Sequence, residues 1–193
     1  LRRAAGRRIR ATGRMRAATL ALSLAAAAAA AGGVPEPEGY RMEAYRAPTP
    51  ETLAGAEVVD TEAARALWES GSAAFVDVLP RKERPPDLPA EVIWRDAPRD
   101  SIPGAVWAPN TGYGALDPAR DAYLRATLAE ATGGDRAHPV LFFCLAECWM
   151  SWNAAKRARE AYGYEAVIWY PEGTDGWAAA GHPLERVEPK PRP

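Results

Sequence analysis

Cysteine and histidine are scarce in this sequence, which has two residues of each type among 193. A zinc site would have to combine both cysteines with His138 and His182, and their spacing along the chain forms no ligand motif. The chain also lacks a Cys-x-x-Cys-His sequence, the attachment site of c-type haem, and any other cofactor motif. We therefore predict no bound metal and no resident cofactor.

The chain also lacks a hydrophobic run long enough to cross a membrane. Its most apolar segment, residues 17–31, would rise roughly 22 Å as a helix, against a hydrocarbon core of about 30 Å. Seven arginines precede that segment, and residues 1–31 contain no acid. This pattern predicts a secretory signal peptide in residues 1–31 and no stable membrane insertion. Met15 is a better start than Leu1, so we interpret residues 1–14 as upstream sequence included by a misplaced start. The alternative is an alanine-rich leader without a targeting role.

Charge excludes one class of partner once residues 1–31 are set aside. The whole chain has 24 basic and 25 acidic residues, and the leader arginines account for seven of the basic ones. The remainder has 17 basic and 25 acidic residues, which is a net charge of −8. Nucleic-acid binding needs a basic surface, so we predict no nucleic-acid partner.

Apolar runs alternate with helical patterns between residues 57 and 184. Strands are predicted at 57–59, 74–79, 139–143 and 166–170, and helices at about 61–69, 118–131 and 151–160. This alternation predicts an α/β fold with a central, mostly parallel sheet flanked by helices on both faces. Residues 32–56 predict an extended N-terminal segment, and the charged residues 185–193 predict a loose tail. Within residues 80–100, Val92-Ile93-Trp94 indicates an inserted strand or a docked loop.

Both cysteines lie in one short segment, Cys144-Leu145-Ala146-Glu147-Cys148. A structural disulfide gains most by closing a long loop, so this spacing favours local thiol chemistry. Cys144 directly follows the buried strand 139–143 and precedes a helix, where N–H groups and the helix dipole favour an anion and lower a thiol pKa. We therefore predict Cys144 as a nucleophile and Cys148 as the thiol that resolves its oxidised form. The alternative is a buried, inert cysteine at a strand end.

Several segments resemble the rhodanese family in their order and spacing. They are Asp77 on the strand 74–79, the turn Ile102-Pro103-Gly104-Ala105, Cys144 after Val140-Leu141-Phe142-Phe143, and Gly181-His182-Pro183. The resemblance implies a rhodanese-like domain at residues 57–184 with a sulfurtransferase or thiol-redox site. It implies Cys144 as the nucleophile and Asp77 as a supporting residue. The implied active-site loop also contains Leu145, Ala146, Glu147, Trp149 and Met150.

A closer resemblance is to the PQQ-dependent catabolism-associated CXXCW motif proteins, a rhodanese-like subgroup. It rests on residues 102–107, 110–116, 144–156 and 169–177, although the cysteine motif here is Cys-x-x-x-Cys-Trp. The resemblance implies a periplasmic protein associated with PQQ-dependent alcohol oxidation. Its implied partners are a PQQ-dependent dehydrogenase or cytochrome c, and a sulfur donor or a protein disulfide.

Three positions depart from the rhodanese pattern. The loop has no arginine near its end, Leu79 stands where rhodaneses often have arginine, and Ser101 stands where histidine is frequent. In addition, Glu147 places a negative charge beside the nucleophile, which repels an anionic donor. These departures argue against efficient thiosulfate:cyanide sulfur transfer.

Other residues near the loop allow two interpretations each. Trp149 and Trp152 form either an aromatic rim for a ligand or part of the core. Glu172 and Asp175 either support the site, by orienting a partner or binding a cation, or simply hold a turn. Arg157 is expected on the solvated face of its helix.

These observations leave three functional hypotheses. The first is a sulfurtransferase or thiol-redox protein with Cys144 and Cys148 as its reactive pair. The second is a non-catalytic module that binds a quinoprotein dehydrogenase or its cytochrome c. The third is a maturation factor that manages a disulfide in the dehydrogenase. The first accounts best for the paired cysteines.

Overall fold

A computed structural model describes residues 33–95 and 97–191 of the chain, and the predicted signal peptide lies outside these residues. The strands are β1 (Glu57–Val58), β2 (Ala74–Asp77), β3 (Arg99–Ser101), β4 (Val106–Trp107), β5 (Val140–Phe143), β6 (Val167–Trp169) and β7 (Glu185–Val187). The helices are α1 (Thr61–Ser70), α2 (Pro118–Ala131), α3 (Trp149–Glu160) and α4 (Gly173–Ala179). None of the helices in the described ranges is long and apolar enough to cross a bilayer.

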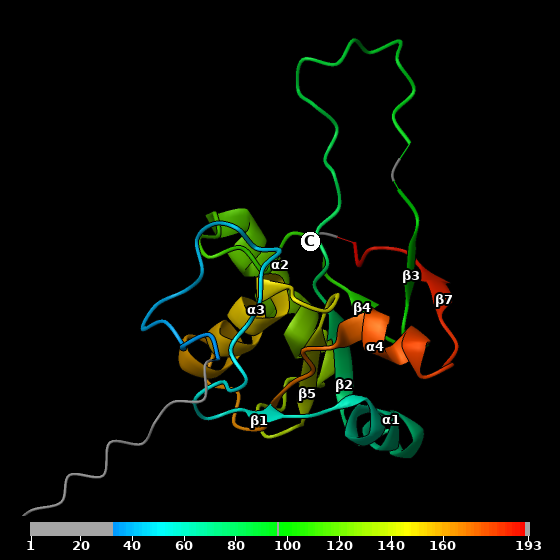
Figure 1. Ribbon diagram of the computed structural model, residues 1–193. Helices are drawn as coiled ribbons and strands as arrows, with labels where there is room; N and C mark the ends of the chain where they lie inside the picture. The colour runs from blue at the N-terminus through cyan, green and yellow to red at the C-terminus, as the bar shows by residue number, and fades with distance from the viewer. Residues whose placement is uncertain (1–32, 96, 192–193) are drawn as a thin grey trace, which may run out of the picture. The chain divides into compact units, whose positions relative to one another are not determined.

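A parallel sheet with the strand order β1-β6-β5-β2-β4 forms the centre of the domain (Figure 1). Its middle strand β5 is buried along its whole length, and Val140 pairs with Ala74 on one side and Val167 on the other. An uninterrupted apolar run is what a strand covered on both faces requires. The predicted α/β fold with a central parallel sheet is therefore confirmed.

Alternate residues of β5 face two separate apolar clusters. Val140 and Phe142 belong to one cluster with residues of α2 and α3, whereas Leu141 and Phe143 belong to the other with residues of α1 and α4. Side chains alternate between the two faces of a strand, so each face of the sheet has its own pair of helices. This three-layer arrangement is the predicted one, with helices on both faces.

The helix ends follow from local sequence. Asp60 caps α1 by accepting a hydrogen bond from the Ala63 N–H at 2.9 Å, and Asp117 caps α2 in the same way through Arg120 at 2.8 Å. Both are N-cap residues that satisfy otherwise unpaired N–H groups. Helix α1 ends at Gly71, whose φ of 61° lies in the left-handed region that favours glycine.

Residues 185–190 pair with the rest of the domain, which contradicts the expectation of a loose tail over that part of residues 185–193. Strand β7 pairs antiparallel with β3 to form a second, two-stranded sheet. Beyond it, the Lys190 N–H donates to the Trp107 carbonyl at 2.8 Å and the Lys190 carbonyl accepts from Tyr123 at 2.7 Å. Backbone pairing leaves the charged side chains in solvent, which is why the charged composition did not reveal this strand.

Residues 80–98 form a long excursion between β2 and β3 (Figure 1). Its apolar patch, Val92-Ile93-Trp94, forms no strand, and Ile93 is 78% exposed, whereas Trp94 is half-buried. Hydrogen bonds within the excursion hold it together: the Arg84 guanidinium donates to the carbonyls of Leu88, Pro89 and Val92. Proline interrupts strand pairing, which accounts for the failed expectation of an inserted strand.

Candidate functional site

The two cysteines lie in a tight loop at the carboxyl edge of the sheet. Strand β5 ends at Phe143 and helix α3 begins at Trp149, so residues 144–148, the cysteine loop, join them directly. Glu147 has a φ of 50°, which lets the chain reverse within these few residues at a conformational cost for a side chain with a Cβ. Both thiols are free, and Cys144 and Cys148 are 0% and 2% exposed. The two cysteines are therefore shielded from solvent, whereas Glu147 between them is exposed.

The two cysteine side chains interact, and their pKa values shift in opposite directions. The thiol of Cys144 interacts with the sulfur of Cys148, and its Sγ also lies 3.4 Å from Ser151 Oγ. The hydrogen bond from Cys144 is the largest cause that lowers the pKa of Cys148 to about 6. Burial opposes this change, whereas the N–H groups of Met150 and Leu145 and the charge of Arg46 add to it. These interactions favour the thiolate form at Cys148.

The pKa of Cys144 moves in the opposite direction. Burial and the neighbouring Cys148 sulfur raise the pKa of Cys144 well above its ordinary value. The expectation that the start of the helix would acidify Cys144 is wrong, because the sulfur of Cys148, the N-cap residue of α3, takes that place. A buried thiol beside a thiolate keeps its proton because a second negative charge would be repelled.

A buried ion pair between Asp77 and Arg99 supports the cysteine loop. Asp77, at the end of β2, accepts hydrogen bonds from Arg99 Nε at 2.7 Å and from Ser101 Oγ at 2.6 Å. Burial raises the pKa of Asp77, and the guanidinium of Arg99 opposes that rise. The same guanidinium lies 3.5 Å from the Cys144 carbonyl and 3.3 Å from Thr174 Oγ1. Asp77 therefore supports the cysteine loop through Arg99, which the sequence interpretation missed.

Helix α4 holds the loop from the side. The N–H of Thr174 donates to the Cys144 carbonyl at 3.0 Å, and Asp175 accepts from the Ala146 N–H at 3.1 Å. Gly173, with a φ of 54°, permits this contact, because a Cβ there would lie 2.4 Å from the Cys144 carbonyl oxygen. Asp175 thus lies at the loop as expected. Glu172 instead accepts from the Thr61 hydroxyl on α1 and is not brought to the cysteines.

A segment of the N-terminal region covers the loop from above. We call residues 41–52 the strap. The Ala47 N–H donates to the Glu147 carbonyl at 3.1 Å, and the Trp149 N–H donates to the Tyr45 carbonyl at 2.9 Å. Between them, Arg46 lies opposite Cys148, and its guanidinium donates to the Ala146 carbonyl at 2.7 Å. These contacts join residues about a hundred positions apart, and no local pattern in the sequence indicates them.

The tryptophans and Arg157 belong to the interior. Trp149 and Trp152 are 1% and 0% exposed and their rings lie 5.3 Å apart, so they are core residues rather than a ligand rim. The expectation that Arg157 is solvated is wrong, since it is 5% exposed. Its guanidinium donates to the carbonyls of Tyr113 and Gly114 at 2.8 Å. Met150, also buried, lies against the loop around Gly112.

Four N–H groups around the cysteine loop have acceptors. Those of Leu145 and Met150 stabilise the Cys148 sulfur, that of Ala146 donates to Asp175, and that of Trp149 donates to the strap. N–H groups at a helix N-terminus favour an anion. Here two of these donors favour the thiolate form of Cys148.

Residues 60–180 match the family model of the rhodanese-like domain. The chain belongs to the rhodanese-like domain family. The matched range runs from the cap of α1 past α4, so it contains Asp77, Arg99 and both cysteines, whereas the strap lies outside it.

Solved structures similar to this rhodanese-like chain include three transferases. Thiosulfate sulfurtransferase from Pseudomonas aeruginosa is 23% identical with a TM-score of 0.46, covering 70% of this chain but 21% of its own. The polysulfide-sulfur transferase homodimer from Wolinella succinogenes is 19% identical with a TM-score of 0.43, covering 68% of this chain and 80% of its own. The 3-mercaptopyruvate sulfurtransferase from Leishmania major is 17% identical with a TM-score of 0.41, covering 75% and 40%. This chain therefore spans about a fifth of the Pseudomonas protein. No curated protein matches the sequence.

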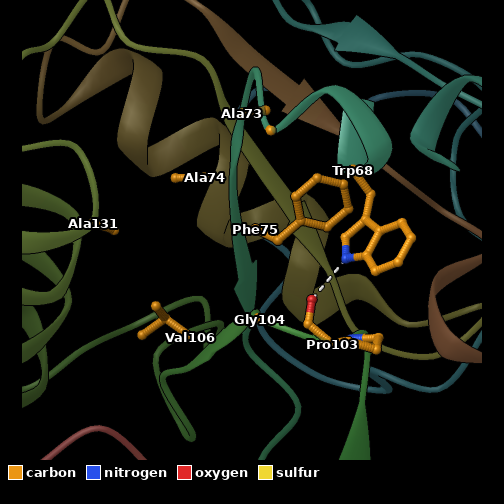
Figure 2. Close-up of a pocket in the computed structure, with 9 residues that line it drawn as sticks. Trp68, Ala73, Ala74, Phe75, Pro103, Gly104, Val106 and Ala131 are labelled. Atoms are coloured by element: carbon orange, nitrogen blue, oxygen red, sulfur yellow. Dashed lines mark hydrogen bonds between the residues drawn. The ribbon is translucent and has the colours of Figure 1, made fainter. Parts of the chain in front are cut away.

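Two cavities of this rhodanese-like domain lie apart from the cysteines. One of about 290 Å³ is lined by Trp68, Phe75 and Pro103 among others, near the amino end of β2 (Figure 2). Trp68 Nε1 donates there to the Pro103 carbonyl at 2.7 Å. A second cavity of about 440 Å³ is lined by polar residues that include Arg81 and Arg120. Neither cavity is lined by Cys144 or Cys148, so neither gives access to the sulfurs.

Proposed function

We propose that this protein carries out thiol–disulfide exchange with Cys148 as the attacking thiolate and Cys144 as the resolving thiol. The observation that carries the proposal is the division of protons between the two sulfurs, which leaves Cys148 with a pKa of about 6 beside a protonated Cys144. The thiolate is the nucleophilic form of cysteine, so Cys148 is reactive near neutral pH. The proposed roles are the reverse of those that the sequence suggested.

The proposed exchange has two balanced steps. The Cys148 thiolate attacks one sulfur of a substrate disulfide, which forms a mixed disulfide and releases the other substrate sulfur as a thiolate. Cys144 then gives its proton to that released thiolate and attacks the Cys148 sulfur. The second substrate thiolate leaves, and Cys144 and Cys148 end as an internal disulfide. The cysteine pair is oxidised by two electrons, and the substrate disulfide is reduced to one thiol and one thiolate, which carry the proton and the negative charge that the pair held at the start.

Family membership supports a second candidate, the transfer of a sulfane sulfur. Cys144 directly follows β5 within the matched range, which is the position that the rhodanese resemblance gives to the nucleophile. In this reaction a cysteine thiolate takes the outer sulfur of a donor, becomes a persulfide and passes the sulfur to an acceptor thiolate. The negative charge of Glu147 in the loop favours an uncharged disulfide over an anionic donor such as thiosulfate.

A redox titration of the full chain separates these two candidates. Protein equilibrated in glutathione buffers is alkylated and mapped by mass spectrometry, and a parallel sample receives thiosulfate or polysulfide. We expect an internal Cys144–Cys148 disulfide, and we expect Cys144→Ser to accumulate a mixed disulfide on Cys148. A labile persulfide without an internal disulfide would replace the exchange proposal with sulfur transfer. A Cys148→Ser variant that still exchanges through Cys144 at the normal rate would reverse the assigned roles.

We further propose a setting for this chemistry in the bacterial periplasm, beside PQQ-dependent alcohol oxidation. The composition of residues 1–31 and the Cys-x-x-x-Cys-Trp segment support this setting. The reaction partner would be a disulfide in a PQQ-dependent dehydrogenase or its cytochrome c. In an alcohol-oxidising bacterium, Cys144→Ser should trap that partner as a mixed disulfide. If a variant without either cysteine sustains growth on the alcohol as well as wild type does, the protein is instead a non-catalytic accessory factor.

A further inference from the structure

The strap is attached to the domain at both ends and in the middle. In the middle, the Tyr45 hydroxyl accepts from the Gly114 N–H at 3.2 Å, and Trp149 Nε1 donates to the Pro48 carbonyl at 3.1 Å. Asn153 of α3 holds Arg41 by two hydrogen bonds of 2.9 Å, one to its N–H and one to its carbonyl. At the other end, Trp152 Nε1 donates to the Thr52 carbonyl at 3.1 Å. Between these anchors the strap belongs to no strand, although Arg46 makes an isolated bridge to Cys148. The middle of the strap can therefore leave the loop without breaking the central sheet.

The strap and the cysteine loop that it covers each contain one residue with a strained backbone conformation. Ala44 in the strap and Glu147 in the loop have φ values of 46° and 50°. The left-handed region costs a residue with a Cβ roughly 1–2 kcal/mol. Opening the strap would let Ala44 leave this conformation, and it would expose the Cys148 sulfur, which is now almost inaccessible.

Two central contacts of the strap come from its backbone, in addition to those of the Arg46 and Tyr45 side chains. The two hydrogen bonds that join it to Glu147 and Trp149 come from backbone groups of Ala47 and Tyr45. An extended peptide of any sequence presents the same N–H and carbonyl groups, which is how peptides add to an exposed strand edge. When the strap leaves, the Trp149 N–H and the Glu147 carbonyl become available for such pairing.

We propose that the strap occupies, in the free protein, a docking edge for an extended polypeptide segment that carries a disulfide. The proposal rests on the exchange function above and assigns it a protein substrate rather than a small inorganic one. A docked segment would pair with residues 147–149 in place of the strap and bring its sulfur against Cys148. Arg46 leaves with the strap, so its charge would act on the resting loop and not on the docked complex.

Proline at position 47 tests whether the strap gates Cys148. Ala47→Pro removes the N–H that bonds to Glu147, whereas Ala47→Ser keeps it and is the matched control. The full chain is labelled with N-ethylmaleimide at about pH 8, above the Cys148 pKa of about 6, and the label is mapped by mass spectrometry. We expect Ala47→Pro to label Cys148 about fivefold faster than wild type, the factor for one ordinary hydrogen bond.

A second variant is expected to slow the labelling of Cys148, so the test does not depend on the folding of Ala47→Pro alone. Ala44→Gly relieves strain in the closed strap and should label more slowly than wild type. Equal labelling rates in all four proteins would refute the gate. This readout needs no disulfide exchange, so it is independent of the proposed function.

Strand docking is tested with a short β-forming peptide whose cysteine carries thionitrobenzoate as a mixed disulfide. Cys148 attacks the peptide sulfur and releases coloured thionitrobenzoate. We expect Ala47→Pro to react several-fold faster with this peptide than with an N-methylated version that cannot pair. If both peptides react equally while free cysteine–thionitrobenzoate also reacts, the docking edge is refuted and exchange stands. If none of the three disulfides reacts, the exchange function itself fails, and the docking proposal fails with it.

Discussion

The pKa of Cys148 should depend on its hydrogen bond from Cys144. The pKa falls from an ordinary 9.0 to about 6, and the Cys144 thiol is the largest cause. Each pKa unit corresponds to about 1.36 kcal/mol, so the whole drop represents about 4 kcal/mol in favour of the thiolate. A hydrogen bond to a charged group contributes roughly 1.5–3 kcal/mol. Cys144→Ala should therefore raise the pKa of Cys148 by roughly one to two units.

Thiolate absorbance in the ultraviolet, followed against pH in the reduced full chain, measures this change. Wild type should titrate at about 6. Cys144→Ser is the matched control, because its hydroxyl can still donate and should keep the pKa of Cys148 low. A Cys144→Ala variant that still titrates at about 6 would refute the assignment. The N–H groups of Met150 and Leu145 would then be the main cause.

Three further predictions concern stability. Arg99→Ala leaves a buried acid unpaired and should cost about 3–5 kcal/mol in denaturant unfolding, against less than about 1 kcal/mol for Arg186→Ala in an exposed pair; equal losses would contradict this. Gly173→Ala should cost more than Gly71→Ala, because a Cβ at position 173 meets the Cys144 carbonyl and one at position 71 meets nothing within 4 Å; thermal unfolding checks the order. Because the folded pKa of Cys148 is depressed, its contribution to stability is present above pH 9.0 and is lost as pH falls through about 6. The free-energy advantage of wild type over Cys148→Ser should therefore shrink over that range, and a constant difference would disprove the linkage.

The sequence predicted the elements whose pattern is local. Val140–Phe143 is an uninterrupted apolar run, and a strand buried on both faces requires such a run. Asp60 stands where an N-cap is needed and Pro118 suits the first turn of a helix, so the starts of α1 and α2 could be placed. The position of Cys144 at the end of β5 followed from the same local pattern, and it led correctly to the carboxyl edge of the sheet.

Pairings between distant segments were not predictable in this way. Strand β7 forms because its backbone meets β3, more than eighty residues earlier in the chain, and Glu185 and Arg186, two of its three residues, are charged and exposed. The strap has no alternation or capping pattern that points to the cysteine loop. A backbone hydrogen bond carries no side-chain signature, so contacts made by backbone alone leave little trace in one sequence.

The missing arginine of the loop shows how local interpretation falls short at the site. Trp149 and its neighbours provide no cation, which suggested a loop poorly suited to a sulfur anion. The structure brings two guanidinium groups from elsewhere, Arg99 at the Cys144 carbonyl and Arg46 at the Ala146 carbonyl. Of these, Arg46 lowers the pKa of Cys148, and it belongs to the strap. The strap therefore shields the Cys148 sulfur and, through Arg46, adds to the lowering of its pKa, to which the hydrogen bond from Cys144 contributes most.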